Sequence, residues 1–112
     1  MKDYAGSTID FGDRVRIRRT PETVAAGIAG RDGVVHGWTT PSLGYADRVI
    51  GEPVDDRACN VQVDDSPDSF WLAGDLVEFL DHGSGTTAVI GETTIVKQAD
   101  GSWTQVPSKG GD

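Results

Sequence analysis

Strict alternation of apolar and polar residues in two segments constrains this chain more than any other feature. The segment "GDRVRIRR" places Val15 and Ile17 between arginines, and "ACNVQVDD" places Cys59, Val61 and Val63 around Asn60 and Gln62. A period of two is that of a β-strand with one buried face. The sequence therefore predicts two half-buried strands, whose outward faces carry arginines in the first and amides in the second.

The segment "DSFWLAGDLVEFLDH", residues 68–82, is compatible with one helix or with two strands. A helix over 69–81 would have Gly74 at its centre and apolar residues around most of its circumference. Two strands, "SFWLA" and "LVEFL", need only a one-turn bend at "AGD", and each has an ordinary strand length. We favour the two strands.

The remaining segments predict further strands joined by turns. "GVVHGW" is predicted to be a strand, whereas "TPETVAAGIAG" is interpreted as a loop and Gly27, Gly30 and Gly33 as turn glycines. Residues 39–57 form a loop longer than a tight hairpin needs, and loops of this length are often functional. After a Gly-Ser linker at 83–85, residues 86–106 are expected to form a β meander, with hairpin turns at Gly91-Glu92 and Asp100-Gly101.

The predicted fold class is all-β, and the 15 glycines and 5 prolines of the 112 residues agree with a chain rich in turns. Residues 1–10 are interpreted as an N-terminal arm, 11–82 as the main domain and 107–112 as a disordered tail. The chain has no apolar run of signal-peptide or membrane-spanning length, so we expect a cytoplasmic protein that does not contact membranes.

The strand pattern from "GDRVRI" to "LVEFLD" resembles the SH3-like barrel, in the form found in photosystem I subunit IV and the nitrile hydratase β subunit. The piece "RVRI…GRDGVV" is also similar to the KOW element of ribosomal and transcription-elongation proteins, with Gly33 and Val34 matching the end of that motif. The resemblance covers residues 11–82 and implies a small five-stranded barrel followed by the C-terminal meander. It also implies a non-catalytic subunit that docks on a larger partner.

The charge is uneven, with a net value of −8, and residues 41–82 hold ten acidic residues against two arginines. A KOW module that contacts RNA would need a basic surface, whereas the basic stripe here is limited to Arg14, Arg16 and Arg18. Nucleic-acid binding is therefore not favoured.

No group of residues predicts catalysis, a metal site or a cofactor. His36, His82 and the single cysteine lack the spacing of a zinc site, and Asp64, Asp65 and Asp68 lack the glycine and glutamate of an EF-hand loop. Cys59 is expected to be a small core residue, with a reactive thiol as the alternative. We expect a protein that is not an enzyme.

The surface residues that best suit a protein partner come from the long loop and from two aromatic positions: Trp38, Leu43, Tyr45, Arg48 and Trp71. Plain core packing is the alternative for the two tryptophans. The leading hypothesis is an accessory or adaptor subunit that binds a protein through this aromatic loop face. The alternatives are a KOW-like module that contacts RNA or the transcription and translation machinery, and an acidic inhibitor that mimics nucleic acid. The sequence does not indicate an oligomeric state.

Overall fold

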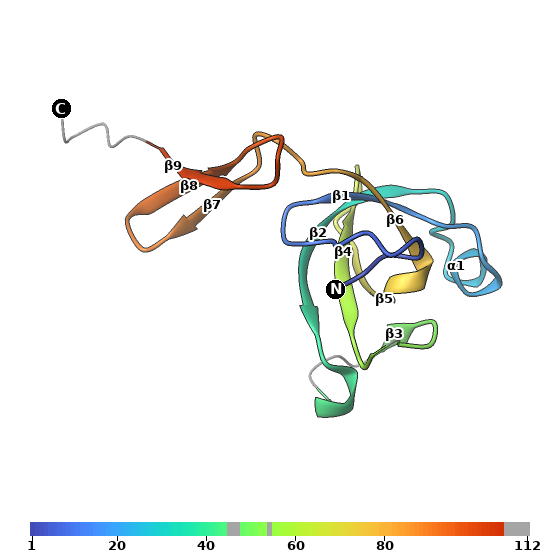
Figure 1. The fold of residues 1–112 in the computed structure, drawn as a ribbon. Coiled ribbons are helices and arrows are strands. Elements are labelled where there is room, and N and C mark those ends of the chain that lie inside the picture. The colour runs from blue at the N-terminus through green and yellow to red at the C-terminus, as the bar shows by residue number, and fades with distance from the viewer. Residues whose placement is uncertain (45–47, 54, 107–112) are drawn as a thin grey trace.

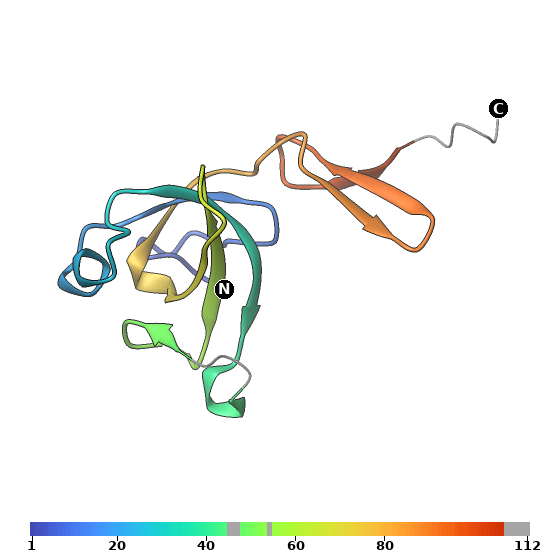
Figure 2. The same cartoon turned by 180° about the vertical axis from the view of Figure 1, so that it is seen from behind.

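The computed structural model describes residues 1–44, 48–53 and 55–106, which form two β-sheets. The main sheet has six strands in the order β3-β5-β4-β2-β1-β6, and the meander has three in the order β7-β8-β9 (Figure 1). The main sheet curls around the core, and the meander extends from it, which gives the molecule extents of 54 × 28 × 27 Å (Figure 2). The predicted all-β fold class is confirmed.

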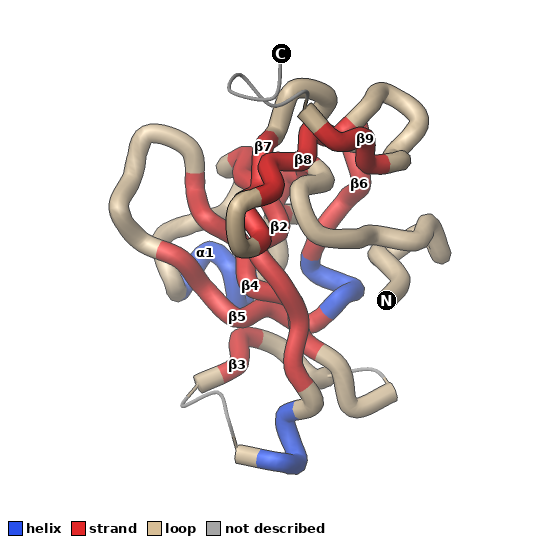
Figure 3. Tube along the Cα trace, turned by 90° about the vertical axis from the view of Figure 1, so that its left-hand side faces the viewer, coloured by secondary structure: helices blue, strands red, loops and turns tan. Residues whose placement is uncertain are grey.

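The strands of the main sheet are β1 (Arg14–Ile17), β2 (Asp32–Thr39), β3 (Val49–Ile50), β4 (Ala58–Val63), β5 (Ser69–Ala73) and β6 (Val77–Asp81). Those of the meander are β7 (Thr87–Ile90), β8 (Thr93–Lys97) and β9 (Trp103–Gln105). Three short helices lie in the connections of the main sheet: α1 (Pro21–Ala25), η1 (Pro41–Leu43) and η2 (Gly74–Leu76), as Figure 3 shows.

The alternating segments form β1 and β4, and their apolar faces make the core. Val15, Ile17, Cys59 and Val61 are each 0% exposed and Val63 is 2% exposed. They pack in one cluster with other apolar residues of the same unit: Ile9, Ile28, Val35, Leu72, Ala73, Leu76 and Val77. All of these residues precede the meander, so the buried apolar cluster lies within the main sheet and its connections.

Residues 69–81 form two strands around a bend, as predicted. The bend is the 3-10 turn η2, which separates β5 from β6. Gly74 is required here because a Cβ at this position would lie 2.3 Å from the carbonyl oxygen of Lys2. β6 then returns antiparallel to β1, with Val77 opposite Ile17.

The interpretation of "TPETVAAGIAG" as a loop is wrong at its first turn, where α1 forms. Thr20 caps this helix by accepting from the Thr23 amide, and the Thr23 hydroxyl accepts from the Thr20 amide in return. Pro21 at the first helical position has the backbone angle that a helix start needs. The five-residue length of α1 leaves too little periodicity for a pattern to indicate it.

Gly33 is not a turn glycine, because it lies within β2 opposite Val63. A Cβ there would lie 2.5 Å from the carbonyl oxygen of Gln62 and 2.6 Å from Cγ1 of Val61. The strand β4 therefore passes too close for any side chain. Gly27 and Gly30 do occupy turns, with φ values of +76° and +77°.

The long loop contains η1 and β3, and β3 adds to the main sheet parallel to β5, with Val49 beside Trp71 and Ile50 beside Leu72. β3 and β6 are the two edges of this sheet. Within the described ranges no β-ladder joins these two edge strands, so the curved sheet is open between them. The closed five-stranded barrel therefore stays a prediction.

The predicted N-terminal arm packs along β6. The Tyr4 amide donates to the Val77 carbonyl at 3.2 Å, and the Phe79 amide donates to Oδ2 of Asp3 at 2.9 Å. Ile9 is 1% exposed and belongs to the core cluster. This segment covers an edge strand that would otherwise expose unpaired backbone groups.

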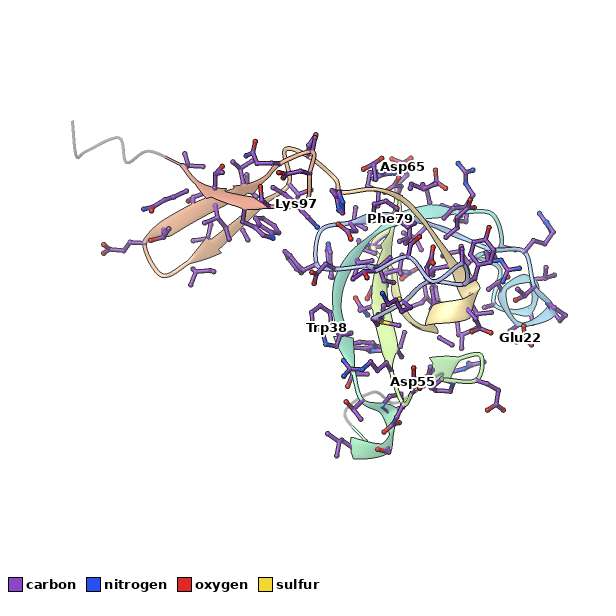
Figure 4. All side chains as sticks on the ribbon, in the orientation of Figure 1. Glu22, Trp38, Asp55, Asp65, Phe79 and Lys97 are labelled. Atoms are coloured by element: carbon purple, nitrogen blue, oxygen red, sulfur yellow. The ribbon has the colours of Figure 1, made fainter. Side chains whose placement is uncertain are left out.

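The C-terminal strands pair as predicted, with Ile90 opposite Thr93 across the first turn and Lys97 opposite Trp103 across the second. The Gly-Ser linker brings the meander back against the main sheet. Gly83 is buried, and the Gly85 amide donates to the Lys97 carbonyl at 2.8 Å. Lys97 lies at the junction of the two sheets (Figure 4), where its ammonium group pairs with Asp13.

Candidate functional site

A pocket of about 530 Å³ opens between α1 and the β3 and β5 edge of the main sheet. It is lined by Ala25, Ala26, Arg48, Ile50, Ser69, Phe70 and Trp71. Its volume is in the range of ligand pockets, and five of its seven lining residues are apolar. We call it the α1–β5 pocket.

The sheet register explains which side chains reach this pocket. Phe70 lies opposite Val61 and Ile50 lies beside Leu72, so both belong to the core-facing side of the sheet. Both are partly buried and pack against the core cluster. Ile50 and Phe70 line the pocket at the edge of the core cluster, where their side chains form its apolar floor.

Small residues of α1 leave the pocket open. Ala26 ends the helix as its C-cap, and its amide donates back to the carbonyls of Glu22 and Val24. Because Ala25 and Ala26 have no side chain beyond Cβ, the helix approaches β5 without filling the space between them. A larger side chain at either position would occupy the pocket.

Arg48 supplies a cation to the α1–β5 pocket, and an acidic residue lines the cavity next to it. Arg48 is exposed and also lines a neighbouring cavity of about 270 Å³, together with Glu22. Glu22 lies in the first turn of α1, where its hydrogen bond to its own amide and that to Thr20 lower the pKa of its carboxyl. Charged side chains of both signs therefore lie near the apolar floor of the pocket, the cation at the pocket itself and the anion at the adjoining cavity.

The structure brings together two of the five predicted partner-binding residues. Arg48 and Trp71 both line the α1–β5 pocket. Trp38 is on β2 and does not line the pocket, and it is 45% exposed rather than packed in the core. Leu43 is 64% exposed on η1, and Tyr45 lies outside the described residues. Of the described residues of the predicted aromatic loop face, only Arg48 and Trp71 therefore line this pocket.

The floor of the pocket is not among the site residues that the sequence predicts. The sequence predicts Phe70 only as part of a strand, and it places Ile50 within the long loop of residues 39–57. The pairing of β3 with β5 brings them together, and two residues are too few for a strand pattern to predict it. The remaining signal is the "FW" pair, which in a strand directs one aromatic ring to each face.

The arginines of the basic stripe are engaged with carboxylates and backbone groups. Arg14 donates to Asp64 at 2.5 Å, and Arg16 donates to Asp32 at 2.8 Å. These hydrogen bonds raise the pKa of both guanidinium groups. Arg18 donates to the carbonyl of Asp75 at 2.7 Å and lies over the Tyr4 ring, 4.2 Å from its centroid. The acidic partners neutralise much of the stripe.

The residues considered for metal binding and thiol chemistry are placed apart. Among the described residues, His, Cys, Asp and Glu side chains do not gather in groups of three or more that could hold a metal ion. Burial raises the pKa of the Cys59 thiol to about 12, which favours the core interpretation over a reactive thiol. In the same part of the chain, no helix has the length and apolar character to cross a membrane.

Comparison with protein-family models, with curated proteins and with solved structures gives no match to this chain. The α1–β5 pocket and the residues around it are therefore the features of this chain that bear on its function.

Proposed function

We propose that this protein is a non-catalytic interaction module, an accessory or adaptor subunit that binds an extended protein segment at the α1–β5 pocket. The observation that carries the proposal is a pocket with an apolar floor of Ile50 and Phe70, placed beside an edge strand. Arg48 at the rim supplies a cation for a carboxylate of the bound segment.

The edge strand β3 supports the binding of an extended chain. It pairs with β5 on one side and forms the outer edge of the main sheet on the other. An extended segment can add to such an edge through main-chain hydrogen bonds, while an apolar side chain enters an adjacent pocket. Arginine and aromatic residues, which are enriched at the centres of interfaces, are both present here.

A peptide selection tests this proposal. Random peptides displayed on phage are selected on the immobilised protein, and one selected peptide is titrated into labelled protein while amide shifts are recorded. We expect the shifts to concentrate at residues 25–26, 48–50 and 69–71. Ala26→Trp, which fills the pocket, should abolish binding, and Arg48→Glu should weaken it.

The matched control is Arg57→Glu, because Arg57 is exposed and does not line the α1–β5 pocket. It makes the same charge change as Arg48→Glu and should leave the affinity within about twofold of wild type, since a charge away from a contact contributes little. Peptides that bind Ala26→Trp as tightly as wild type, or shifts confined to Trp38 and Leu43, would contradict the assignment of the pocket.

The two alternative functions have less support. For RNA binding by a KOW-like surface, Arg14 and Arg16 would have to leave Asp64 and Asp32 before they could contact phosphates. In these same ion pairs, Asp64 and Asp32 are bound to arginines of the chain itself. An acidic mimic of nucleic acid would need such carboxylates free to contact a basic partner. Mobility shifts with random RNA and duplex DNA at low salt test the first alternative, and competition with DNA for a basic partner tests the second.

A further inference from the structure

Three ionisable side chains meet at the junction between the main sheet and the meander. The ammonium group of Lys97 pairs with Oδ1 of Asp13, and these side chains are 1% and 0% exposed. Nδ1 of His82 lies 3.0 Å from the same oxygen, and the His82 side chain is 35% exposed. A buried amine thus touches a buried carboxyl group, and a third titratable group links that carboxyl group to solvent.

Aromatic rings and backbone surround this group. The rings of Phe11 and Trp103 lie 5.8 Å apart, Lys97 Nζ is 5.6 Å from the Trp103 centroid, and the Phe79 ring packs on His82 at 4.9 Å. Gly12 is buried beside them, and a Cβ there would lie 3.1 Å from Cδ of Lys97. The reacting atoms are therefore held in a confined site of low polarity.

Hydrogen bonds fix both partners. Lys97 Nζ also donates to the Phe11 carbonyl at 2.6 Å, and the Asp10 amide donates to Oδ2 of Asp13 at 2.8 Å. One carboxyl oxygen thus faces a backbone amide, and the other faces Lys97 and His82. This arrangement provides a nucleophile, an electrophile, a donor for a developing oxyanion and a proton relay.

We propose that Lys97 and Asp13 join in an intramolecular amide, which staples the meander covalently to the main sheet. In the first step a proton passes from the Lys97 ammonium to Oδ1 of Asp13, which leaves a neutral amine beside a neutral carboxylic acid. Nζ then attacks Cγ of Asp13, and the negative charge that develops on Oδ2 is stabilised by the Asp10 amide.

The tetrahedral intermediate then loses Oδ1 as water. His82 accepts a proton from Nζ and delivers it to Oδ1, so the Cγ–Oδ1 bond breaks as the C=O bond to Oδ2 reforms. The three hydrogens of the ammonium group end as one amide hydrogen and the two hydrogens of water. No oxidant, reductant or other reactant is needed.

Two physical effects drive this reaction. The fold holds the amine and the carboxyl group in contact. Folding has therefore already removed the translational freedom that two separate reactants would lose on reaction. The amide also replaces a pair of buried charges, which are costly to keep out of water, by one neutral group. His82 is a catalytic residue in this scheme, because its ring nitrogen touches Oδ1 and moves a proton from Nζ to that oxygen, although it is not part of the product.

The test is the intact mass of the full chain, measured under denaturing conditions after the folded protein has been incubated at neutral pH. We expect a mass one water below that of the sequence, and a branched peptide after proteolysis that joins the segments containing Asp13 and Lys97. Lys97→Arg keeps the cation but cannot form the bond under these conditions, so its mass should equal that of its sequence.

Asp-Gly pairs can lose water through succinimide formation, and the chain has two of them, Asp32-Gly33 and Asp100-Gly101. A succinimide persists in Lys97→Arg and is hydrolysed by mild alkali, whereas the amide staple is absent from that variant and survives alkali in wild type. His82→Ala, shown to be folded by circular dichroism, should form the staple at least tenfold more slowly. A wild-type protein that keeps its full mass, or loses water without a branched peptide, overturns the proposal.

Discussion

Asp13 and Lys97 stand 84 positions apart in the sequence, yet their side chains meet out of contact with water. Asp13 directly precedes β1 of the main sheet, and Lys97 ends β8 of the meander. Either charge would be costly to bury without the other, so this contact specifies how the meander packs on the main sheet.

Removal of one partner should therefore be costly. Lys97→Met leaves the Asp13 carboxylate buried beside His82 alone, and we expect the free energy of unfolding to fall by about 3–5 kcal/mol relative to wild-type protein in which the Lys97–Asp13 amide has not formed. Adding Asp13→Asn removes the buried charge and keeps the hydrogen bond from the Asp10 amide, so the double variant should recover part of the loss. Denaturant titration measures both, and equal stabilities of the single and double variants would contradict this account.

Truncation after Gly83 should leave the main sheet folded. The core cluster consists of residues up to Phe79, and the removal of Lys97 lets water reach Asp13. The shortened chain should keep dispersed amide resonances for β1 to β6, with a lower free energy of unfolding than the full chain. A peptide of residues 84–106 should be unfolded, because it carries none of the core. Collapse of the amide spectrum of the truncated protein would show that the meander is essential to the core.

Gly33→Ala should destabilise the protein through steric overlap. The new methyl group would lie 2.5 Å from a backbone oxygen of β4, which cannot rotate away, and overpacking of this kind costs about 1–3 kcal/mol. Gly27→Ala is the matched control, since nothing lies within 4 Å there and only its φ of +76° opposes the change, at about 1–2 kcal/mol. Thermal unfolding of the two variants compares the effects, and a smaller loss at Gly33 than at Gly27 would contradict the close approach of β2 and β4.

Cys59 should resist thiol reagents in the native protein. It is 0% exposed, and burial raises the pKa of its thiol to about 12, so almost no thiolate forms at pH 8. Labelling by a disulfide reagent should proceed only as fast as the protein opens, and it should become rapid in denaturant. Immediate labelling of the folded protein would show that this part of the core is accessible.

Stability should decrease in acid partly through Asp32. The hydrogen bond from Arg16 holds the pKa of the Asp32 carboxyl below its ordinary value. A lowered pKa in the folded state stabilises the protein above the unfolded pKa, near 4, and this contribution is lost as the pH falls through the folded pKa. Asp32→Asn should flatten this part of the pH dependence, and Arg16→Ala should flatten it to a similar extent. Denaturant titrations from pH 5 to 2 measure this, and an unchanged slope in both variants would exclude the pair as a source.

The strands were predictable because their evidence is local. Period-two alternation identified β1 and β4, and the Asp100-Gly101 turn identified the last hairpin, since each depends on neighbours in the sequence. A helix of one turn and a strand of two residues lack enough residues to establish a period, so the sequence predicts a loop where α1 forms and a long loop where β3 forms. The α1–β5 pocket lies between these two elements, and it could not be predicted for that reason.

The sequence by itself determined the all-β class, the faces of β1 and β4 that enter the core, and the burial of Cys59. These properties follow from the order of side chains along an extended backbone. Only the tertiary structure decided which charges meet: Arg14 with Asp64, Arg16 with Asp32, and Lys97 with Asp13. Coulombic and hydrogen-bond partners are set by distance in space. The sequence around a charged residue does not indicate which distant residue its side chain will contact in the folded chain.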